Sequence, residues 1–430
     1  DQGRRTDTWL RTNADNTQWM AHTQQEYDTS GRVSRAIAKS VNSAGDIVTI
    51  QDVTYCYNTA SAAPTCGTGT SGDRAKLHWQ LDNLTGQSTT YGYDTSGRLA
   101  SATQAGGTNP TTWTYTYDAR GNRLTANTTG GSTTSQTLTF NAANHVTTTG
   151  HTYDGTGNLT ADTAGTYTYN GAQQMTGVSN ATGSFTYKYA GTSQVEVLQQ
   201  QQANVTRKLT YGRTNQAGLP VLEQAQWGSI TAYIENDPVT GQPLLLRTST
   251  NTVSLYVYDG LGNPTAILRD FGSPGYTYTY DPFGLPTLTY NSGGTGQTQN
   301  PFLFKGGIQD RATGWVHFGN RWYNTTLGRW TQQDTLDAPL DPKNANRYAY
   351  AGGDPINNSD PTGSVSLSEA SGVGLASAVG GAAGGCVVGA ISTSPGGPTA
   401  AAGCATGAVL GFISGGISGF VGSIVTQSIS

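Results

Sequence analysis

Charged side chains are scarce in this chain. They make up 12% of its 430 residues, and the formal net charge is −4. A weakly acidic chain does not attract nucleic acid through bulk electrostatics, so we expect no nucleic-acid partner. Glycine is abundant instead, with 58 copies, and small and hydroxylated residues dominate. This composition disfavours helices and predicts a chain rich in strands and turns.

Cysteine and histidine are also few, with four and five copies. No Cys-x-x-Cys pair occurs and the histidines are scattered, so we expect no metal site, and nothing points to a cofactor. Cys56 and Cys66 flank a short loop, and Cys386 and Cys404 lie together near the C-terminus. Two local disulfides, as in an exported protein, are one interpretation of these pairs, and four inert thiols are the other.

One short pattern recurs along the first two thirds of the chain. An aromatic residue is followed by Asp, Asn or Gly and then by a turn, most clearly at 27–33 (YDTSGRV), 93–99 (YDTSGRL) and 117–124 (YDARGNRL). Looser copies begin at Tyr57, Phe140, Tyr153, Tyr169, Tyr189, Tyr211, Tyr258 and Tyr280. A repeat with this period indicates one supersecondary unit copied along the chain, with neighbouring units burying each other's apolar faces.

Each unit is predicted to be a β-hairpin of roughly 20 residues. Residues 276–280 (YTYTY) alternate with a period of two, which is typical of a strand with one ring-bearing face. In Asp-x-x-Gly, the Asp carboxylate accepts bonds from amides ahead of it, and Gly tolerates positive φ. We expect the rings of successive units to form a ladder of cross-strand contacts.

These motifs resemble the YD repeats of Rhs proteins, Tc-toxin C components and teneurins. A second set of motifs resembles the Rhs-associated core, and these are 280–284 (YDPFG), 300–306 (NPFLFKG), 310–315 (DRATGW), 320–323 (NRWY), 327–334 (LGRWTQQD), 347–350 (RYAY) and 360–363 (DPTG). The resemblance implies an all-β fold: a YD-repeat hairpin spiral that forms a hollow shell, or part of one, closed by the core. It divides the chain into repeats at 1–299, the core at 300–363 and a tail at 364–430.

In this family the core is an aspartyl self-protease that cuts just after its closing Asp-Pro-x-Gly-x motif. Carried over by motif position, the two acids are Asp334 and Asp360, and the accompanying arginine is Arg321. Two neighbouring carboxylates do not both ionise readily, so one can activate water while the other stays protonated. The resemblance places the cleaved bond between Ser364 and Val365.

Three features depart from the family pattern at this site. Asp337 follows Asp334 closely and competes for its role, and the loop from Asp334 to Asp360 is expanded around residues 337–343. Ser364 stands where relatives usually have a large apolar residue. A purely structural cap, in which these acids form turns before proline, is therefore an alternative. A third chemistry is an acyl shift onto the Ser364 hydroxyl, for which no base is identified.

The tail from 364 to 430 has a different character. Glu369 is its only charged residue, and Gly, Ala, Ser, Val and Ile dominate. Two apolar stretches, 371–391 and 400–425, carry small residues at helical spacing and favour a hairpin of membrane helices. The alternative is a Gly/Ala-rich leader that precedes a toxin domain. Without His, Asp, Lys or Arg, this segment cannot readily provide hydrolytic chemistry.

Two functions remain open. The first is an Rhs-type effector shell that encloses its own C-terminal segment and releases it by self-cleavage, with a delivery system and a target-cell membrane as partners. The second is a teneurin-like adhesion protein that binds a glycan or cell-surface partner and is not cut. Both predict a secreted or cell-surface bacterial protein. The chain begins at Asp1 inside the repeats, so we interpret it as the C-terminal piece of a longer protein.

Overall fold

The computed structural model describes residues 4–364, 367 and 368, with gaps at 60, 68–74, 194, 216–217, 239, 251, 270–273, 292–299 and 336–344. The tail, with its predicted helices and with Cys386 and Cys404, lies outside the described residues, as do Asp337 and Val365. No helix within the described residues is long and apolar enough to cross a membrane.

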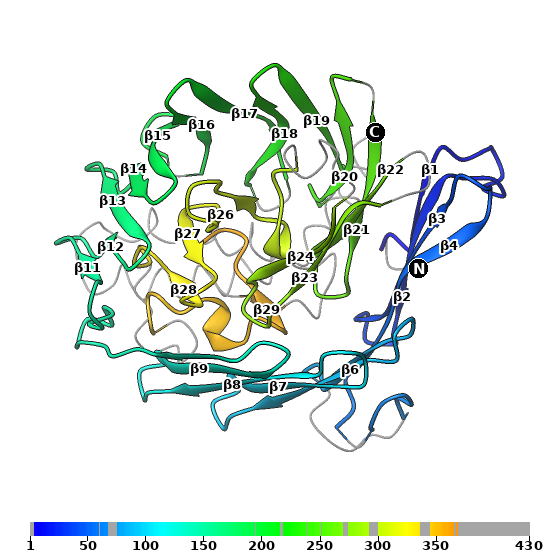
Figure 1. The fold of residues 1–430 in the computed structure, drawn as a ribbon, viewed down its shortest axis with the longest axis horizontal. Helices are drawn as coiled ribbons and strands as arrows, with labels where there is room; N and C mark the ends of the chain where they lie inside the picture. Colours follow the sequence, from blue (N-terminus) through cyan, green and yellow to red (C-terminus); the bar gives the residue numbers. More distant parts are fainter. Residues whose placement is uncertain are drawn as a thin grey trace, which may run out of the picture.

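The chain forms two long antiparallel meanders that curve into a ring, with the core inside it (Figure 1). The first sheet runs in chain order through β1 (Asp7–Leu10), β2 (Ala21–Tyr27), β3 (Val33–Val41), β4 (Ile47–Cys56), β5 (Trp79–Asp82), β6 (Ser88–Tyr93), β7 (Leu99–Ala105), β8 (Thr111–Tyr117), β9 (Arg123–Gly130) and β10 (Thr134–Thr137). The second runs through β11 (Thr152–Tyr153), β12 (Leu159–Ala161), β13 (Gly165–Tyr169), β14 (Met175–Asn180), β15 (Gly183–Tyr189), β16 (Val197–Gln202), β17 (Val205–Thr214), β18 (Pro220–Trp227), β19 (Ile230–Asn236), β20 (Pro243–Thr248), β21 (Val253–Tyr258), β22 (Pro264–Arg269), β23 (Pro274–Tyr280) and β24 (Pro286–Asn291). The all-β prediction is confirmed.

The core is built from shorter pieces. These are η1 (Phe304–Gly306), β25 (Ile308–Gln309), β26 (Val316–Phe318), β27 (Arg321–Asn324), β28 (Arg329–Trp330), η2 (Ala351–Gly353), β29 (Asn358–Ser359) and β30 (Leu367–Ser368). Strands β25 to β28 form a four-stranded sheet and β29 pairs with β30. Buried aromatic side chains hold these pieces together, and the Tyr323 and Tyr350 ring centroids lie 4.2 Å apart.

The turn of each unit forms as the sequence predicts. Asp94 Oδ1 accepts hydrogen bonds from the amides of Ser96 and Arg98, each at 2.9 Å, and Gly97 adopts φ +78°. Arg98 Nε donates to the other carboxylate oxygen at 2.7 Å. The same pair of amide bonds recurs at Asp28, Asp118, Asp154, Asp259 and Asp281.

Neighbouring units are linked through the hydroxyl of the repeat tyrosine. Tyr117 Oη donates to the carbonyl of Leu99, the first residue of β7 in the preceding unit, at 2.7 Å. The same link occurs from Tyr93 to Leu77, Tyr189 to Met175, Tyr211 to Val197, Tyr258 to Pro243 and Tyr280 to Pro264. The Arg98 guanidinium lies 4.5 Å from the centre of the Tyr117 ring and adds a cation–π contact between units.

The sequence pattern did not identify one of the repeat units. The predicted repeats leave a long interval between Tyr211 and Tyr258, and the structure fills it with β19 and β20. Asn236 occupies the tyrosine position there, and its Nδ2 donates to the carbonyl of Leu222 in the preceding unit at 3.0 Å. The side-chain amide of Asn236 thus replaces the tyrosine hydroxyl as the hydrogen-bond donor.

The repeat position also bends the wall. The strand register shifts beside Tyr27, Tyr93, Tyr117, Tyr189 and Tyr258. A β-bulge bends its strand and increases the local twist. Because the bulge recurs at the same place in successive units, the sheets curl into the ring of Figure 1.

The start of the first sheet packs against β19 to β22 of the second sheet and closes the ring. Arg5 Nη1 lies 2.6 Å from Asp237 Oδ2, and Gln51 Nε2 donates to the carbonyl of Tyr258 at 2.9 Å. One apolar cluster contains Leu10, Ala21 and Ala38 from the first sheet together with Leu255, Val257, Ala266 and Leu268 from the second. Packing of side chains, with a few polar contacts, therefore closes the shell at this seam.

We expect each hydrogen bond from a repeat-tyrosine hydroxyl to make a measurable contribution to stability. Tyr258→Phe removes the donor to the buried carbonyl of Pro243 and should lower the free energy of unfolding by about 1–2 kcal/mol. Urea denaturation would measure the loss. Tyr290→Phe is the control because Tyr290 is 44% exposed, and an equal loss in both variants would contradict the link's role.

The turn at Asp281 gives a pH-dependent prediction. The core covers this turn, with Tyr323 donating to the carbonyl of Phe283 at 2.7 Å, and burial raises the pKa of Asp281 to about 6. The folded carboxyl therefore holds its proton more tightly than the unfolded one. Its stabilising effect is complete below the unfolded pKa of 3.8 and is lost as pH rises through about 6.

Asp281→Asn keeps an acceptor oxygen for the turn amides and removes the buried charge. Its unfolding free energy, relative to wild type, should rise by about 2 kcal/mol between pH 4 and pH 7.5, as urea denaturation would measure. Asp154→Asn is the matched control: burial raises the Asp154 pKa, but bonds from Asn158 and Thr156 outweigh it and lower that pKa. Its relative stability should fall over the same range, and a parallel response of both variants would refute the assignment.

Candidate functional site

The three predicted catalytic side chains meet inside the core. Arg321 begins β27, Asp334 follows β28 and Asp360 follows β29. Arg321 Nη2 lies 2.7 Å from Asp334 Oδ2 and 3.1 Å from Asp360 Oδ2. The Arg321 and Asp360 side chains are only 5% and 1% exposed, while Asp334 is 13% exposed. One guanidinium thus bridges two carboxylates that are distant in sequence.

The other two nitrogen atoms of the Arg321 guanidinium also donate hydrogen bonds. Its Nη1 donates to the carbonyl of Arg347 at 3.0 Å, and its Nε donates to the carbonyl of Gly363. Its face lies 4.2 Å from the centre of the Trp330 ring. Burial lowers the pKa of Arg321, and the charges of Asp334 and Asp360 oppose that shift. The guanidinium is therefore held in one orientation.

Asp360 shapes the segment at which cleavage is predicted. Its Oδ1 accepts hydrogen bonds from the Ser364 amide at 3.0 Å and from Thr362 Oγ1 at 3.1 Å. Gly363 adopts φ +65°, and a Cβ there would come within 2.4 Å of the carbonyl oxygen of Phe318. Only glycine fits this turn, which explains the Asp-Pro-x-Gly spacing.

Two contributing residues were not singled out from the sequence. Asn320 Nδ2 donates to Ser364 Oγ at 3.1 Å and to the carbonyl of Thr362 at 3.2 Å. Arg347 Nε donates to the carbonyl of Asp334 at 2.7 Å. Both belong to quoted core motifs, but nothing in a motif shows where a side chain will point. The hydrogen bond from Asn320 gives the Ser364 hydroxyl a polar partner at a position where the family resemblance predicts an apolar residue.

The site brings two carboxylates and one guanidinium next to the Gly363–Ser364 peptide group. Two acids share one cation, so their protonation states are coupled. Arg321 Nε donates to the Gly363 carbonyl oxygen, where a tetrahedral intermediate would develop charge. Asp360 lies beside the Ser364 amide nitrogen. Because Val365 is outside the described residues, Gly363–Ser364 is the peptide group whose contacts can be followed, and the catalytic roles remain a prediction.

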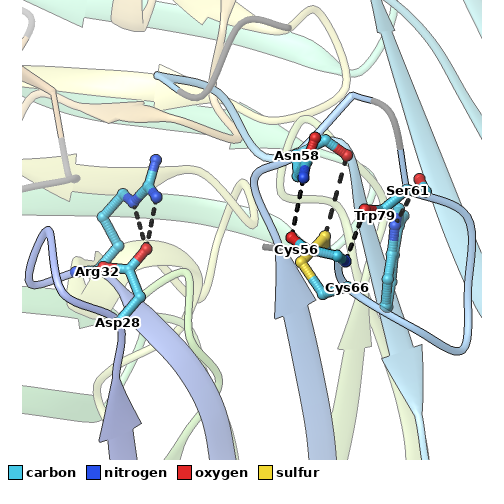
Figure 2. Close-up of a disulfide and its surroundings, with 8 residues drawn as sticks. Asp28, Arg32, Cys56, Asn58, Ser61, Cys66 and Trp79 are labelled. Carbon is cyan, nitrogen blue, oxygen red and sulfur yellow. Dashed lines mark hydrogen bonds and ion pairs between the residues drawn. A yellow bond between two sulfur atoms is a disulfide. The ribbon is translucent and has the colours of Figure 1, made fainter. Parts of the chain in front are cut away.

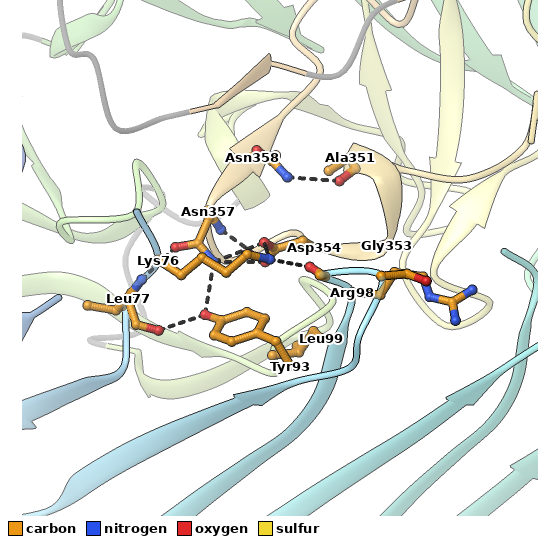
Figure 3. A network of polar contacts seen from close by, with 12 residues as sticks. Lys76, Leu77, Tyr93, Arg98, Leu99, Ala351, Gly353, Asp354, Asn357 and Asn358 are labelled. Carbon is orange, nitrogen blue, oxygen red and sulfur yellow. Dashed lines mark hydrogen bonds and ion pairs between the residues drawn. The ribbon is translucent and has the colours of Figure 1, made fainter. Parts of the chain in front are cut away.

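A polar network anchors the core segment that precedes Asp360 to the wall (Figure 3). Lys76 Nζ lies 2.9 Å from Asp354 Oδ2, and Asn357 Nδ2 donates to Tyr93 Oη at 2.8 Å. The Leu77 amide donates to Asn357 Oδ1 at 2.7 Å. Asp354, which also precedes a proline, therefore has a structural partner outside the candidate site.

The first of the two cysteine pairs forms the predicted disulfide. Cys56 and Cys66 form a disulfide with a Cα–Cα distance of 5.5 Å (Figure 2). Asn58 Nδ2 donates to the carbonyl of Gly67 at 2.9 Å, and Trp79 Nε1 donates to that of Ser61 at 3.0 Å. The loop is thus closed both covalently and by hydrogen bonds.

Removing the Arg321 guanidinium, which both carboxylates share, should destabilise the fold. Arg321→Met leaves Asp334 and Asp360 buried without their bridge and should lower the free energy of unfolding by about 3–5 kcal/mol in urea denaturation. Arg120→Met, at an exposed arginine, is the control. Adding Asp334→Asn and Asp360→Asn to Arg321→Met should recover part of the loss, and an unchanged stability of Arg321→Met would contradict the bridge.

Comparison with known proteins identifies a family that this chain matches. The Teneurin YD-shell family matches residues 74–356. A curated relative, the tRNA3(Ser)-specific nuclease WapA of Bacillus spizizenii, is 29% identical over 217 residues, which are 49% of this chain and 9% of that protein.

Solved Tc-toxin structures share the fold. The crystal structure of TcdB2-TccC3 has a TM-score of 0.61 at 17% identity, over 84% of this chain and 20% of that one. TcdB2-TccC3 without its hypervariable C-terminal region gives 0.62 at 17% identity, over 83% and 19%. A Photorhabdus luminescens Tc holotoxin pore with a mutated TccC3 gives 0.60 at 16% identity, over 83% and 19%.

The chain thus spans about a tenth of the curated relative and about a fifth of the Tc-toxin chains. The family match covers most of the repeats and of the core, and the structural likeness extends over the ring and the core that it surrounds. The chain belongs to the teneurin YD-shell family and is a YD-repeat protein of the Rhs type.

Proposed function

We propose that this chain is the C-terminal part of an Rhs-type toxin shell whose core cuts the chain next to Ser364. The observation that carries the proposal is the Arg321 bridge between Asp334 and Asp360, directly at the turn that leads into Ser364. After cleavage, the segment that begins at Ser364 or Val365 would remain enclosed by the shell as a separate peptide.

In the proposed reaction, water adds to the carbonyl carbon of the cleaved bond. The ionised member of the acid pair takes a proton from water, and the protonated member returns one to the leaving nitrogen. Arg321 stabilises the oxyanion. The family pattern favours the Ser364–Val365 bond, whereas the contacts of Arg321 with the Gly363 carbonyl and of Asp360 with the Ser364 amide favour Gly363–Ser364.

The role as a toxin shell draws support from two further observations. The fold resembles that of TccC3, a protein with a hypervariable C-terminal region, and the curated relative is a nuclease. The tail of this chain has no acids or bases suited to such chemistry apart from Glu369, so we propose that it acts physically on a target membrane or leads into a further domain. A disulfide at Cys56 and Cys66 fits a secreted or cell-surface protein that a delivery system exports.

A cleft of about 510 Å³ between the first sheet, the end of the second and the core supports a second candidate function. Amide, hydroxyl and aromatic side chains line it, including Gln80, Gln104 and Trp113, together with charged side chains such as those of Asp52 and Asp82. Rings combined with amide and carboxylate groups are suited to carbohydrate. Binding of a glycan on a cell surface, without cleavage, is therefore the alternative.

Intact mass under denaturing conditions would test the first proposal. Wild type should give two fragments in place of one 45.0-kDa chain, and the masses distinguish cleavage before Ser364 from cleavage after it. Asp334→Asn and Asp360→Asn should both remain whole. Asp354→Asn is the matched control, because Asp354 is also buried and precedes a proline but pairs with Lys76, so this variant should still be cut.

A single uncut mass for freshly folded wild type would refute self-cleavage and favour the glycan-binding alternative. Cleavage that persists in Asp334→Asn and Asp360→Asn would instead show that other groups cut the chain. Circular dichroism of each variant would establish that an uncut chain is folded.

A further inference from the structure

Two buried arginines face one small cavity where the core meets the wall. Arg123 begins β9 in the first sheet, and Arg329 begins β28 in the core. They are 8% and 5% exposed. Both line a cavity of about 20 Å³ together with residues of the wall and the core. This volume exceeds the 10–15 Å³ that a water molecule needs and suits an occupant of about that size.

Each guanidinium is only partly satisfied by its neighbours. Arg123 Nη2 donates to the carbonyl of Thr326 at 3.0 Å, and Arg329 Nη2 donates to that of Asn144 at 2.6 Å. The Nε of each arginine is buried and has no hydrogen-bond partner among the described residues. A buried donor without a partner costs free energy, so two of them beside one cavity call for an acceptor.

The cavity also carries uncompensated charge. Apart from the two arginines, its lining consists of neutral residues: Tyr117, Gly121, Asn122, Phe140, Phe283, Leu327, Gly328, Asn346, Tyr348, Ala349, Tyr350 and Gly353. Asp118 attracts Arg329 and Asp281 attracts Arg123 electrostatically, but neither acid lines the cavity. Burial and the charge of Arg123 both lower the pKa of Arg329.

Aromatic faces provide only part of the compensation. Arg123 lies 4.3 Å from the centre of the Phe283 ring, and Arg329 lies 4.8 Å from those of Phe140 and Tyr348. Buried cations are normally paired with an anion. Within the described residues, neither arginine forms an ion pair with a carboxylate.

We propose that the cavity between Arg123 and Arg329 binds a monatomic anion, with chloride as the physiological occupant. The anion accepts hydrogen bonds from the arginines, neutralises their repulsion and joins the wall strand β9 to the core strand β28. The small volume excludes large organic anions. This site is separate from the acids around Arg321 and does not depend on self-cleavage.

Thermal unfolding of the wild-type chain in sodium chloride and in sodium gluconate, at equal ionic strength, tests the site. The melting temperature should be about 2–4 °C higher in chloride, because a ligand that binds only the folded state stabilises it. The difference should vanish in Arg329→Met and shrink in Arg329→Lys. It should persist in Arg120→Met, at an exposed arginine in the neighbouring turn. Anomalous scattering from bromide-grown crystals should give a peak in the cavity.

Equal melting temperatures in both salts, with no bromide peak, would mean that the cavity holds water only and would overturn the proposal. A chloride effect that survives in Arg329→Met would place the responsible site elsewhere and would also overturn it. If Arg329→Met does not fold, the bromide peak in wild-type crystals decides the question.

Discussion

The hydrogen bond from a repeat tyrosine to a backbone carbonyl of the preceding unit is the contact on which the shell depends. Tyr117 to Leu99 and Tyr258 to Pro243 are examples from the two sheets. Each bond ties the turn of one unit to the start of the return strand of the unit before, at the position of a bulge.

The same chemistry attaches the core to the wall. Tyr348 Oη donates to the carbonyl of Gly157 at 2.7 Å, Tyr323 Oη to that of Phe283 at 2.7 Å, and Lys305 Nζ to that of Leu261 at 2.7 Å. All three acceptors lie in YD turns. The turns therefore both reverse the chain and present carbonyls to the centre of the ring, where side chains of the core bind them. The position of the candidate site consequently depends on the repeats.

Sequence reasoning succeeded where the determining contacts are local. The Asp-x-x-Gly turns at Asp94 and Asp118 use amides only two and four residues ahead, so their motif is sufficient to predict them. It failed at Asn236, because an amide can replace a phenol as a donor without leaving a recognisable pattern. It also missed Asn320, whose side-chain partner Ser364 is distant in sequence.

Sequence patterns were sufficient to predict the class of the fold and the turns, and family resemblance pointed to the three residues of the candidate site. Alternation and turn chemistry act between near neighbours, so a chain can be interpreted in those terms without coordinates. The closure of the wall through the contacts of Arg5 and Gln51, and the bridge from Arg321 to Asp334 and Asp360, became visible in the three-dimensional fold. These contacts join segments whose approach depends on the accumulated curvature of many units, which no local pattern specifies.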